Sequence, residues 1–507
     1  MLLEIVWRSL RFSRLAQGPA VLSWLGSNMR ILDPYRPLIL LLLAMSLLIA
    51  CAAPRRYRPA PISPAETAAS LEARSLLDPG LKQFLDKNLR SPLAEWPPQA
   101  WDLRKLSLAA LYFNPAMDAA RARAAAAEAS IVTAGARPNP TVTLAPGIPS
   151  PYLMTLDFEV PIETAGKRGY RIQQAKALNE AAKLDLAETA WKVRSGVRAA
   201  LVDYFAAARG VDLLQAEAGT RSQQVELFTQ RLEAGEISRP DLEAVRLAAV
   251  DNRVALRATE GHVAETRTAL AAAIGVPAKA LDGLEFSWQD FEQPLSPESL
   301  SAASIERDAV LNRLDVRRGL EEYAATEAAL QLEIARQHPD IQIGPGYQFE
   351  EQDNFFVLGL SATLPIFNRN QGPIAEAEAQ RQEAGARFLA TQAQVIAQSE
   401  AAFVGYQTAL GQLQEVDESL RRIQEQRERM GQQALQVGES DPIELNAVVL
   451  ERSAIAQTRL AAAVQARHAL GELEDAVERP LEPGDTLTPG PTALKGDREY
   501  EFQRRKR

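Results

Sequence analysis

The sequence predicts a mainly helical protein with a small β part, built from one unit that occurs twice. Three pairs of similar stretches predict the duplication, because they follow in the same order with nearly constant offsets. The first pair differs by 438 − 235 = 203 residues. The pairs are "GEISRPDLEAVRL" (235–247) with "GESDPIELNAVVL" (438–450), "ARPNPTVTLAPG" (136–147) with "ARQHPDIQIGPG" (335–346), and "LDFEVPI" (156–162) with "LSATLPI" (360–366).

Each unit has the pattern helix, strand, strand, long helix, turn, helix. We place the units at 104–280 and 306–480, and we expect the connecting segment 281–305 to lie at the middle of the helices. In the first unit, residues 106–136 read as a single helix that stops before Pro138.

Two proline-free stretches predict unusually long helices. They run from about 166 to 233 and from about 373 to 437. At 1.5 Å per residue, each helix would be on the order of 100 Å long. The apolar stripes are narrow and rich in alanine, which is typical of coiled-coil packing against neighbours.

The four strands alternate between apolar and polar residues, which predicts sheets with two different faces. We assign Asp157, Glu159, Ser361 and Thr363 to the polar face. Four strands cannot close a barrel, and an open sheet leaves unpaired edges. Three copies would supply twelve strands, an even number that suits a transmembrane β-barrel with its polar face around an aqueous lumen. The alternative is an ordinary half-buried sheet packed on helices.

The N-terminal region predicts export and lipid attachment. Residues 1–50 read as a signal peptide whose true start is Met29, and "LIAC" ends at the single cysteine, Cys51. This ending resembles a lipobox, in which fatty-acyl chains such as palmitate would be attached to Cys51 and hold the protein to a bilayer. The alternative is a buried thiol at the end of a membrane anchor. Residues 51–103 then begin with a Pro-rich tether, and 481–507 form a polar tail.

Over about residues 104 to 480, these features together resemble the TolC family of outer-membrane efflux ducts. The motifs are the duplication, the "ARPNP" and "ARQHP" stretches, the "VPIETAGKR" and "LPIFNRNQG" stretches, and the two "GE" turns. "PIETAGKRGYR" and "LPIFNRNQG" are most similar to the CzcC-like branch, which serves heavy-metal resistance-nodulation-division (RND) pumps.

The resemblance implies a homotrimer whose long helices form a periplasmic α-helical barrel beneath the β-barrel. It implies three partners, namely a periplasmic membrane-fusion adaptor, an inner-membrane RND-type pump and outer-membrane lipid. Substrate, such as metal cations or small toxic compounds, would pass through without catalysis. A type I protein secretion duct is the alternative within this class.

The two turns are the predicted adaptor contacts. We assign to this contact Gly235, Glu236, Ser238, Gly438, Glu439 and Ser440. The family's acidic pore constriction maps to Asp241, Glu243, Asp441 and Glu444. Carboxylates from three chains would attract cations and raise one another's pKa. The alternative is that these side chains are helix caps and solvated helix faces.

Other functions are disfavoured by composition. The net charge of −9 argues against a nucleic-acid groove. The three histidines, His262, His338 and His468, share no close spacing, so we expect no metal site and no cofactor apart from the lipid on Cys51. No catalytic motif stands out, so we expect no enzyme, with an outer-membrane lipoprotein enzyme as the rival. A periplasmic adaptor is a further rival, but it would carry one hairpin rather than two.

Overall fold

The computed structural model describes residues 57–89, 92–147, 153–288, 291–295, 300–351 and 353–482. The predicted signal peptide, Cys51 and nearly all of the predicted tail lie outside the described residues. The chain divides into two units, 1–67 and 68–507, and helix α4 (Pro64–Glu72) spans their boundary. The elements below belong to the second unit.

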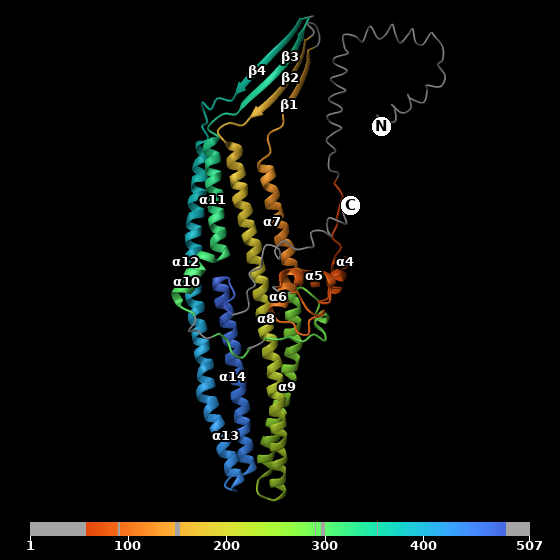
Figure 1. Ribbon diagram of the computed structural model, residues 1–507, viewed down its shortest axis with the longest axis vertical. Coiled ribbons are helices and arrows are strands. Elements are labelled where there is room, and N and C mark those ends of the chain that lie inside the picture. Colours follow the sequence, from red (N-terminus) through yellow and green to blue (C-terminus); the bar gives the residue numbers. More distant parts are fainter. Residues whose placement is uncertain are drawn as a thin grey trace, which may run out of the picture. The chain divides into compact units, whose positions relative to one another are not determined.

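The first copy of the duplicated unit forms helices that lead into and out of a pair of strands (Figure 1). A short helix α5 (Pro79–Asn88) precedes it. Its elements are α6 (Leu103–Phe113), α7 (Pro115–Ala134), β1 (Thr141–Gly147), β2 (Leu153–Ile162), α8 (Lys167–Glu233) and α9 (Arg239–Ile274).

The second copy repeats this order after a short 3₁₀ helix η2 (Ala278–Leu281). Its elements are α10 (Ala302–Asn312), α11 (Leu314–Ala335), β3 (Ile341–Glu350), β4 (Asp353–Ala362), α12 (Gln371–Glu415), a π-helical turn (Val416–Leu420), α13 (Arg421–Gln436) and α14 (Pro442–Val477). The mainly helical fold with four strands and a duplicated unit is therefore confirmed.

The prediction of one helix over 106–136 is wrong. The helix breaks at Asn114, which accepts a hydrogen bond from the Ala116 N–H at 2.9 Å and so begins α7. Pro115 follows at the first helical position, where its missing N–H costs nothing. The second copy breaks at the corresponding place, between α10 and α11.

The two long helices are confirmed but differ from each other. α8 runs without interruption for 67 residues. Its counterpart changes from α12 to α13 through the π-helical turn Val416–Leu420. A π turn inserts one extra residue into the helical repeat, and such turns frequently occur at functional sites.

The strands form one antiparallel sheet in the order β1-β2-β3-β4, whose register separates apolar from polar side chains. Apolar residues lie opposite one another across all four strands. The pairs are Val142 with Phe158, Leu144 with Leu156, Leu156 with Tyr347, Tyr347 with Phe356, and Ile343 with Leu360. The sheet lies beyond the ends of the helices (Figure 1), and Phe356 is 86% exposed, so the alternative of a half-buried sheet packed on helices is wrong.

The connection between the two copies lies against the middle of the helices. Arg467 on α14 donates from Nε to the Phe291 carbonyl oxygen at 2.7 Å. The Tyr406 hydroxyl on α12 donates to the Leu295 carbonyl oxygen. In the segments that the structure describes, no helix combines the length and apolar character needed to cross a membrane.

Candidate functional site

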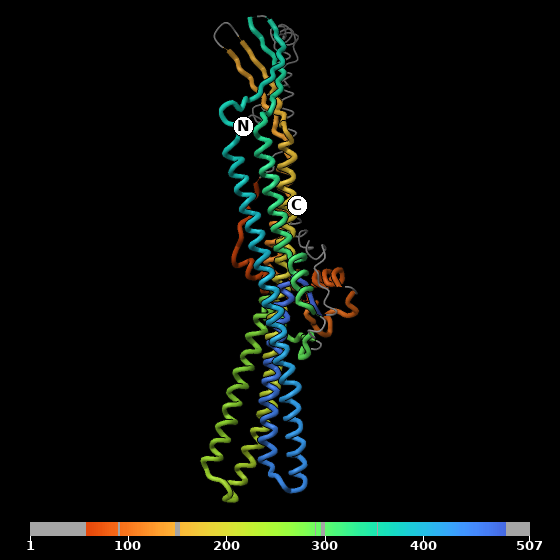
Figure 2. The backbone as a smooth tube through the Cα atoms, turned by 90° about the vertical axis from the view of Figure 1, so that its left-hand side faces the viewer, coloured from red at the N-terminus to blue at the C-terminus, as the bar shows by residue number. Residues whose placement is uncertain are grey.

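Two hairpins, α8–α9 and α13–α14, end side by side at the end of the 68–507 unit that lies opposite the sheet (Figures 1 and 2). In the first turn the Glu236 N–H donates to the Arg231 carbonyl at 2.9 Å, and in the second the Glu439 N–H donates to the Ala434 carbonyl at 2.8 Å. Both hydrogen bonds span five residues and close the end of a helix in the same way. The two turns therefore share one backbone design.

Glycine is required in both turns by backbone conformation. Gly235 has φ of 78° and Gly438 has φ of 79°, in the left-handed region. A Cβ at either position would meet no neighbouring atom within 4 Å, so contacts do not impose the glycine. The left-handed conformation does, since it costs other residues about 1 kcal/mol or more.

The returning helices are capped by side chains predicted from the sequence. In the first turn Asp241 accepts from the Ser238 N–H at 3.0 Å and from the Ser238 hydroxyl at 2.6 Å. In the second turn Asp441 accepts from the Ile443 N–H at 3.0 Å. These contacts satisfy backbone and hydroxyl donors at the helix starts.

The predicted constriction carboxylates all have local partners in one protomer. Asp241 and Asp441 take part in the caps. Glu243 accepts from Arg246 at 2.9 Å, and Glu444 accepts from the Ser440 hydroxyl at 2.7 Å. Within one chain, hydrogen bonds from the side chain and backbone of Ser238 hold the pKa of the Asp241 carboxyl below its usual value.

An ion pair that sequence reasoning missed joins the two hairpins. Arg231, in the last turn of α8, pairs with Asp441 at the start of α14, and its Nε lies 3.4 Å from Glu236. Its position in the last turn of a long helix was the available signal, because a cation there interacts favourably with the helix dipole. Arg231 thus links the two turns within one chain.

At the other end, three of the four predicted lumen residues lie on the polar face of the sheet. Asp157 and Glu159 lie opposite Thr143 and Thr141, and the Ser361 hydroxyl lies 3.3 Å from Gln342 Oε1. Thr363 lies one residue beyond β4, so its predicted place within the strand is wrong.

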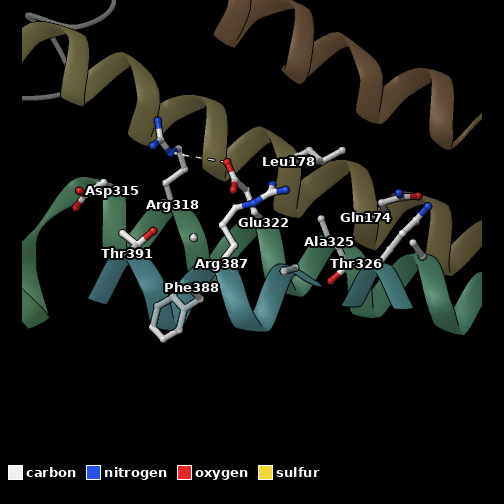
Figure 3. A pocket seen from close by; sticks show the side chains of 14 residues that line it. Gln174, Leu178, Asp315, Arg318, Glu322, Ala325, Thr326, Arg387, Phe388 and Thr391 are labelled. Atoms are coloured by element: carbon white, nitrogen blue, oxygen red, sulfur yellow. Dashed lines mark ion pairs between the residues drawn. The ribbon is translucent and has the colours of Figure 1, made fainter. Parts of the chain in front are cut away.

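A pocket lies between α8, α11 and α12 (Figure 3). Arg318 projects beside Glu322, with Nε 3.7 Å from Oε1, and also pairs with Glu188 on α8 at 2.8 Å. The pair with Glu188 joins α11 to α8, so we assign the charged groups a structural role. Among the described residues, no group of three or more His, Cys, Asp and Glu side chains is arranged to hold a metal ion.

A partly buried carboxyl directly after α14 caps another helix. Glu478 accepts from the Leu314 N–H at 2.5 Å, at the start of α11. Burial raises the pKa of Glu478 to about 7, assisted by the nearby carboxylates of Asp315 and Glu188 and opposed by the Leu314 N–H and by Arg313. Sequence reasoning missed this residue, because its partners come from distant segments.

Glu478 should make stability depend on pH. Its folded pKa is raised from 4.5 to about 7, so its contribution is fully present below pH 4.5 and is lost as the pH rises through 7. The contribution is on the order of 3 kcal/mol. Glu478→Gln should therefore flatten the fall in unfolding midpoint between pH 4.5 and 8, measured by circular dichroism in detergent. Glu472→Gln, at an exposed position on the same helix, should leave that fall unchanged, and an equal slope in both variants would contradict the assignment.

The arrangement described so far defines a fold. A sheet with one apolar and one polar face, joined through very long helices to two capped hairpin turns, is the fold of solved outer-membrane channels. It is similar to VceC from Vibrio cholerae (TM-score 0.59, 19% identity, covering 75% of this chain and 97% of that one). It is also similar to the outer-membrane channel OprN (TM-score 0.60, 16% identity, 83% and 98% covered) and to CusC (TM-score 0.59, 16% identity, 84% and 99% covered).

Sequence comparison gives the same result. The family model described as outer membrane efflux protein matches residues 106–276. The cobalt-zinc-cadmium resistance protein CzcC of Cupriavidus metallidurans is 28% identical over 290 residues, which are 56% of this chain and 68% of that protein. Over residues 106–276, the chain therefore matches the outer membrane efflux protein family.

Proposed function

We propose that three copies of this chain form one duct, in which their sheets close a 12-stranded barrel through the outer membrane and their helices enclose a passage in the periplasm. The observation that carries this proposal is the sheet, whose apolar face is exposed and whose outer strands, β1 and β4, have free edges in the described chain. A barrel closed by further copies would pair these edges and place the apolar face against lipid.

The hairpins support assembly with further copies. α9 exposes Leu247, Val250 and Val254. α13 exposes Ile423 and Met430, and Val437, the residue directly after α13, is exposed as well. The first set is spaced by three and four residues and the second set by seven, and both spacings are typical of a coiled-coil seam. A neighbouring copy can cover these stripes by packing α9 against α13.

The proposed role is passive conduction in a tripartite system. An inner-membrane RND-type pump would supply the energy, and a periplasmic membrane-fusion adaptor would contact the two turns. The name of CzcC, cobalt-zinc-cadmium resistance protein, supports metal cations as the substrate class. The acidic residues near the turns are compatible with cation passage.

The test of the duct is reconstitution. The full chain, purified from outer membranes, should have the mass of a trimer in detergent and should produce conductance steps in planar lipid bilayers. A stable monomer, or a trimer that conducts no ions, would refute the proposal.

Glu444 is the predicted gate residue to test in that assay. We expect Glu444→Gln to move the reversal potential under a KCl gradient toward zero, because three carboxylates that favour cations would be neutralised. Glu439→Gln, in the turn itself, is the matched control and should keep the wild-type reversal potential. An unchanged potential in Glu444→Gln would remove Glu444 from the gate.

Lipid attachment at Cys51 is a separate part of the proposal. We expect Cys51→Ser to lose all incorporation of labelled palmitate, since Cys51 is the only cysteine of the chain. Labelling at the wild-type level would show that the lipid is attached elsewhere. That result would not contradict the proposed duct.

A further inference from the structure

The duplicated unit contains one junction that is formed within the chain and one that is not. The segment 163–167, which runs from the end of β2 to the first residue of α8, contacts the segment 336–340, between α11 and β3. We call this contact the inner junction. By the duplication, segment 367–371 of the second copy corresponds to 163–167, and segment 137–141 of the first copy corresponds to 336–340. These two counterparts lie beside the outer strands β4 and β1. With β2 and β3 between them, these two segments cannot meet in one chain.

The inner junction is held by four hydrogen bonds. Lys167 donates from Nζ to Asp340 Oδ1 at 2.7 Å and to the His338 carbonyl at 2.6 Å. Thr164 donates its N–H to Asp340 Oδ1 at 3.0 Å and its hydroxyl to the Pro339 carbonyl at 2.6 Å. The Lys167 side chain is only 9% exposed, so the junction is a built contact between the two copies of the unit.

The counterpart segments have matching backbones. α8 begins at Lys167 and α12 at Gln371, an offset of 371 − 167 = 204 residues. The residue before each helix adopts the left-handed conformation, with φ of 75° at Gly166 and 62° at Asn370. The segment 367–371 therefore follows the same path out of the sheet.

The side chains at both counterpart positions differ from those of the inner junction. Gln371 takes the place of Lys167, and Thr141 takes that of Asp340, by the 199-residue offset of "ARPNP" and "ARQHP". A charged pair is thus replaced by a neutral amide and a hydroxyl, which can hydrogen-bond to each other. Replacing only one partner would have left a charge without its counterion.

The free counterparts also present apolar surface. Phe367 takes the place of Glu163, a residue that pairs with Arg171 in its own copy of the unit. The Phe367 side chain is 100% exposed, and Leu364 and Ile366 beside it are exposed as well. Residues 137 to 141 are exposed at the opposite edge of the sheet.

We propose that the segment 364–371 of one chain docks on the segment 137–141 of a neighbouring chain. This contact repeats the inner junction between two chains. Gln371 faces Thr141, Asn368 donates to the backbone as Thr164 does, and Phe367 covers the proline-rich segment. This inference rests on the proposed oligomeric duct and names the residues that join its protomers below the barrel.

The first test is crosslinking in outer membranes. The variant Thr141→Cys/Gln371→Cys, treated with a short thiol-specific crosslinker, should give covalent dimers and trimers on denaturing gels. Asp340→Cys/Lys167→Cys is the matched control and should crosslink within one chain, leaving the monomer mass. Each single variant accounts for reaction with Cys51. Trimers that form but are not linked by the first pair would overturn the junction alone, whereas a protein that is monomeric before crosslinking would overturn the proposed duct.

The second test restores the charged pair between chains. Gln371→Lys and Thr141→Asp should each reduce the fraction of trimer that survives heating in detergent, and the double variant should regain it, because it recreates the pair of the inner junction. If the double variant instead loses as much heat-resistant trimer as the two single variants together, the contact is refuted. Phe367→Trp fluorescence that is quenched by brominated lipid would also refute it, since the side chain would then face the bilayer.

Discussion

Replacing Glu474 with alanine is expected to destabilise the chain by about 3 to 5 kcal/mol, the usual cost of removing one partner from a buried ion pair. Glu474 on α14 is 2% exposed and accepts from both terminal nitrogens of Arg194 at 3.1 Å. It also pairs with Arg198, and both arginines lie on α8. Their charges would remain buried without this carboxylate.

The measurement is the urea or thermal unfolding of the variant in detergent. Glu472→Ala, two residues away and exposed on the same helix, is the control and should change the free energy of unfolding by less than about 0.5 kcal/mol. Similar losses in both variants would show that the buried pair contributes nothing specific. The physical reason for the difference is desolvation. Removing Glu474 leaves buried charges without its carboxylate, whereas Glu472 is exposed and water replaces its contacts.

Replacing Leu358 with arginine should prevent stable insertion into the outer membrane. Leu358 lies in the middle of β4 on the apolar face, 77% exposed in the single chain, and we place this face against lipid. Arginine on a lipid-facing strand costs about 2 to 4 kcal/mol at the bilayer midplane. We therefore expect little or no variant in the outer-membrane fraction and little heat-resistant trimer.

The adjacent residue provides the matched control. Val357 lies on the opposite face of β4, so Val357→Arg should insert at close to the wild-type level and change conductance instead. If Leu358→Arg inserts normally and Val357→Arg does not, the two faces of the sheet have been assigned the wrong way round.

Local chemistry made the turns and strands predictable. A glycine followed three residues later by Ser238 or Asp441 specifies a helix end and a helix start through neighbouring atoms alone. The alternation of apolar and polar residues likewise follows from the two-residue period of a strand. Pro115 carried an equally local signal, because proline is tolerated in the first turn of a helix but not in its interior, and the prediction of an unbroken helix over 106–136 was therefore wrong.

Contacts between distant segments could not be predicted. Arg194 and Glu474 are separated by 280 positions, and neither sequence neighbourhood indicates that an ion pair will be buried there. The same holds for Arg231 with Asp441 and for Glu478 at the start of α11. In each case the partner is chosen by how the long helices pack.

The sequence by itself determined the duplication, the long helices, the two-faced strands and the two capped turns, because each follows from residue types at short, fixed spacings. Only the tertiary structure decided the strand register that gathers the apolar side chains on one face, and the charged contacts that join the two copies of the unit. Those features depend on which segments lie side by side, and that arrangement comes from the packing of the whole chain rather than from any one stretch of it.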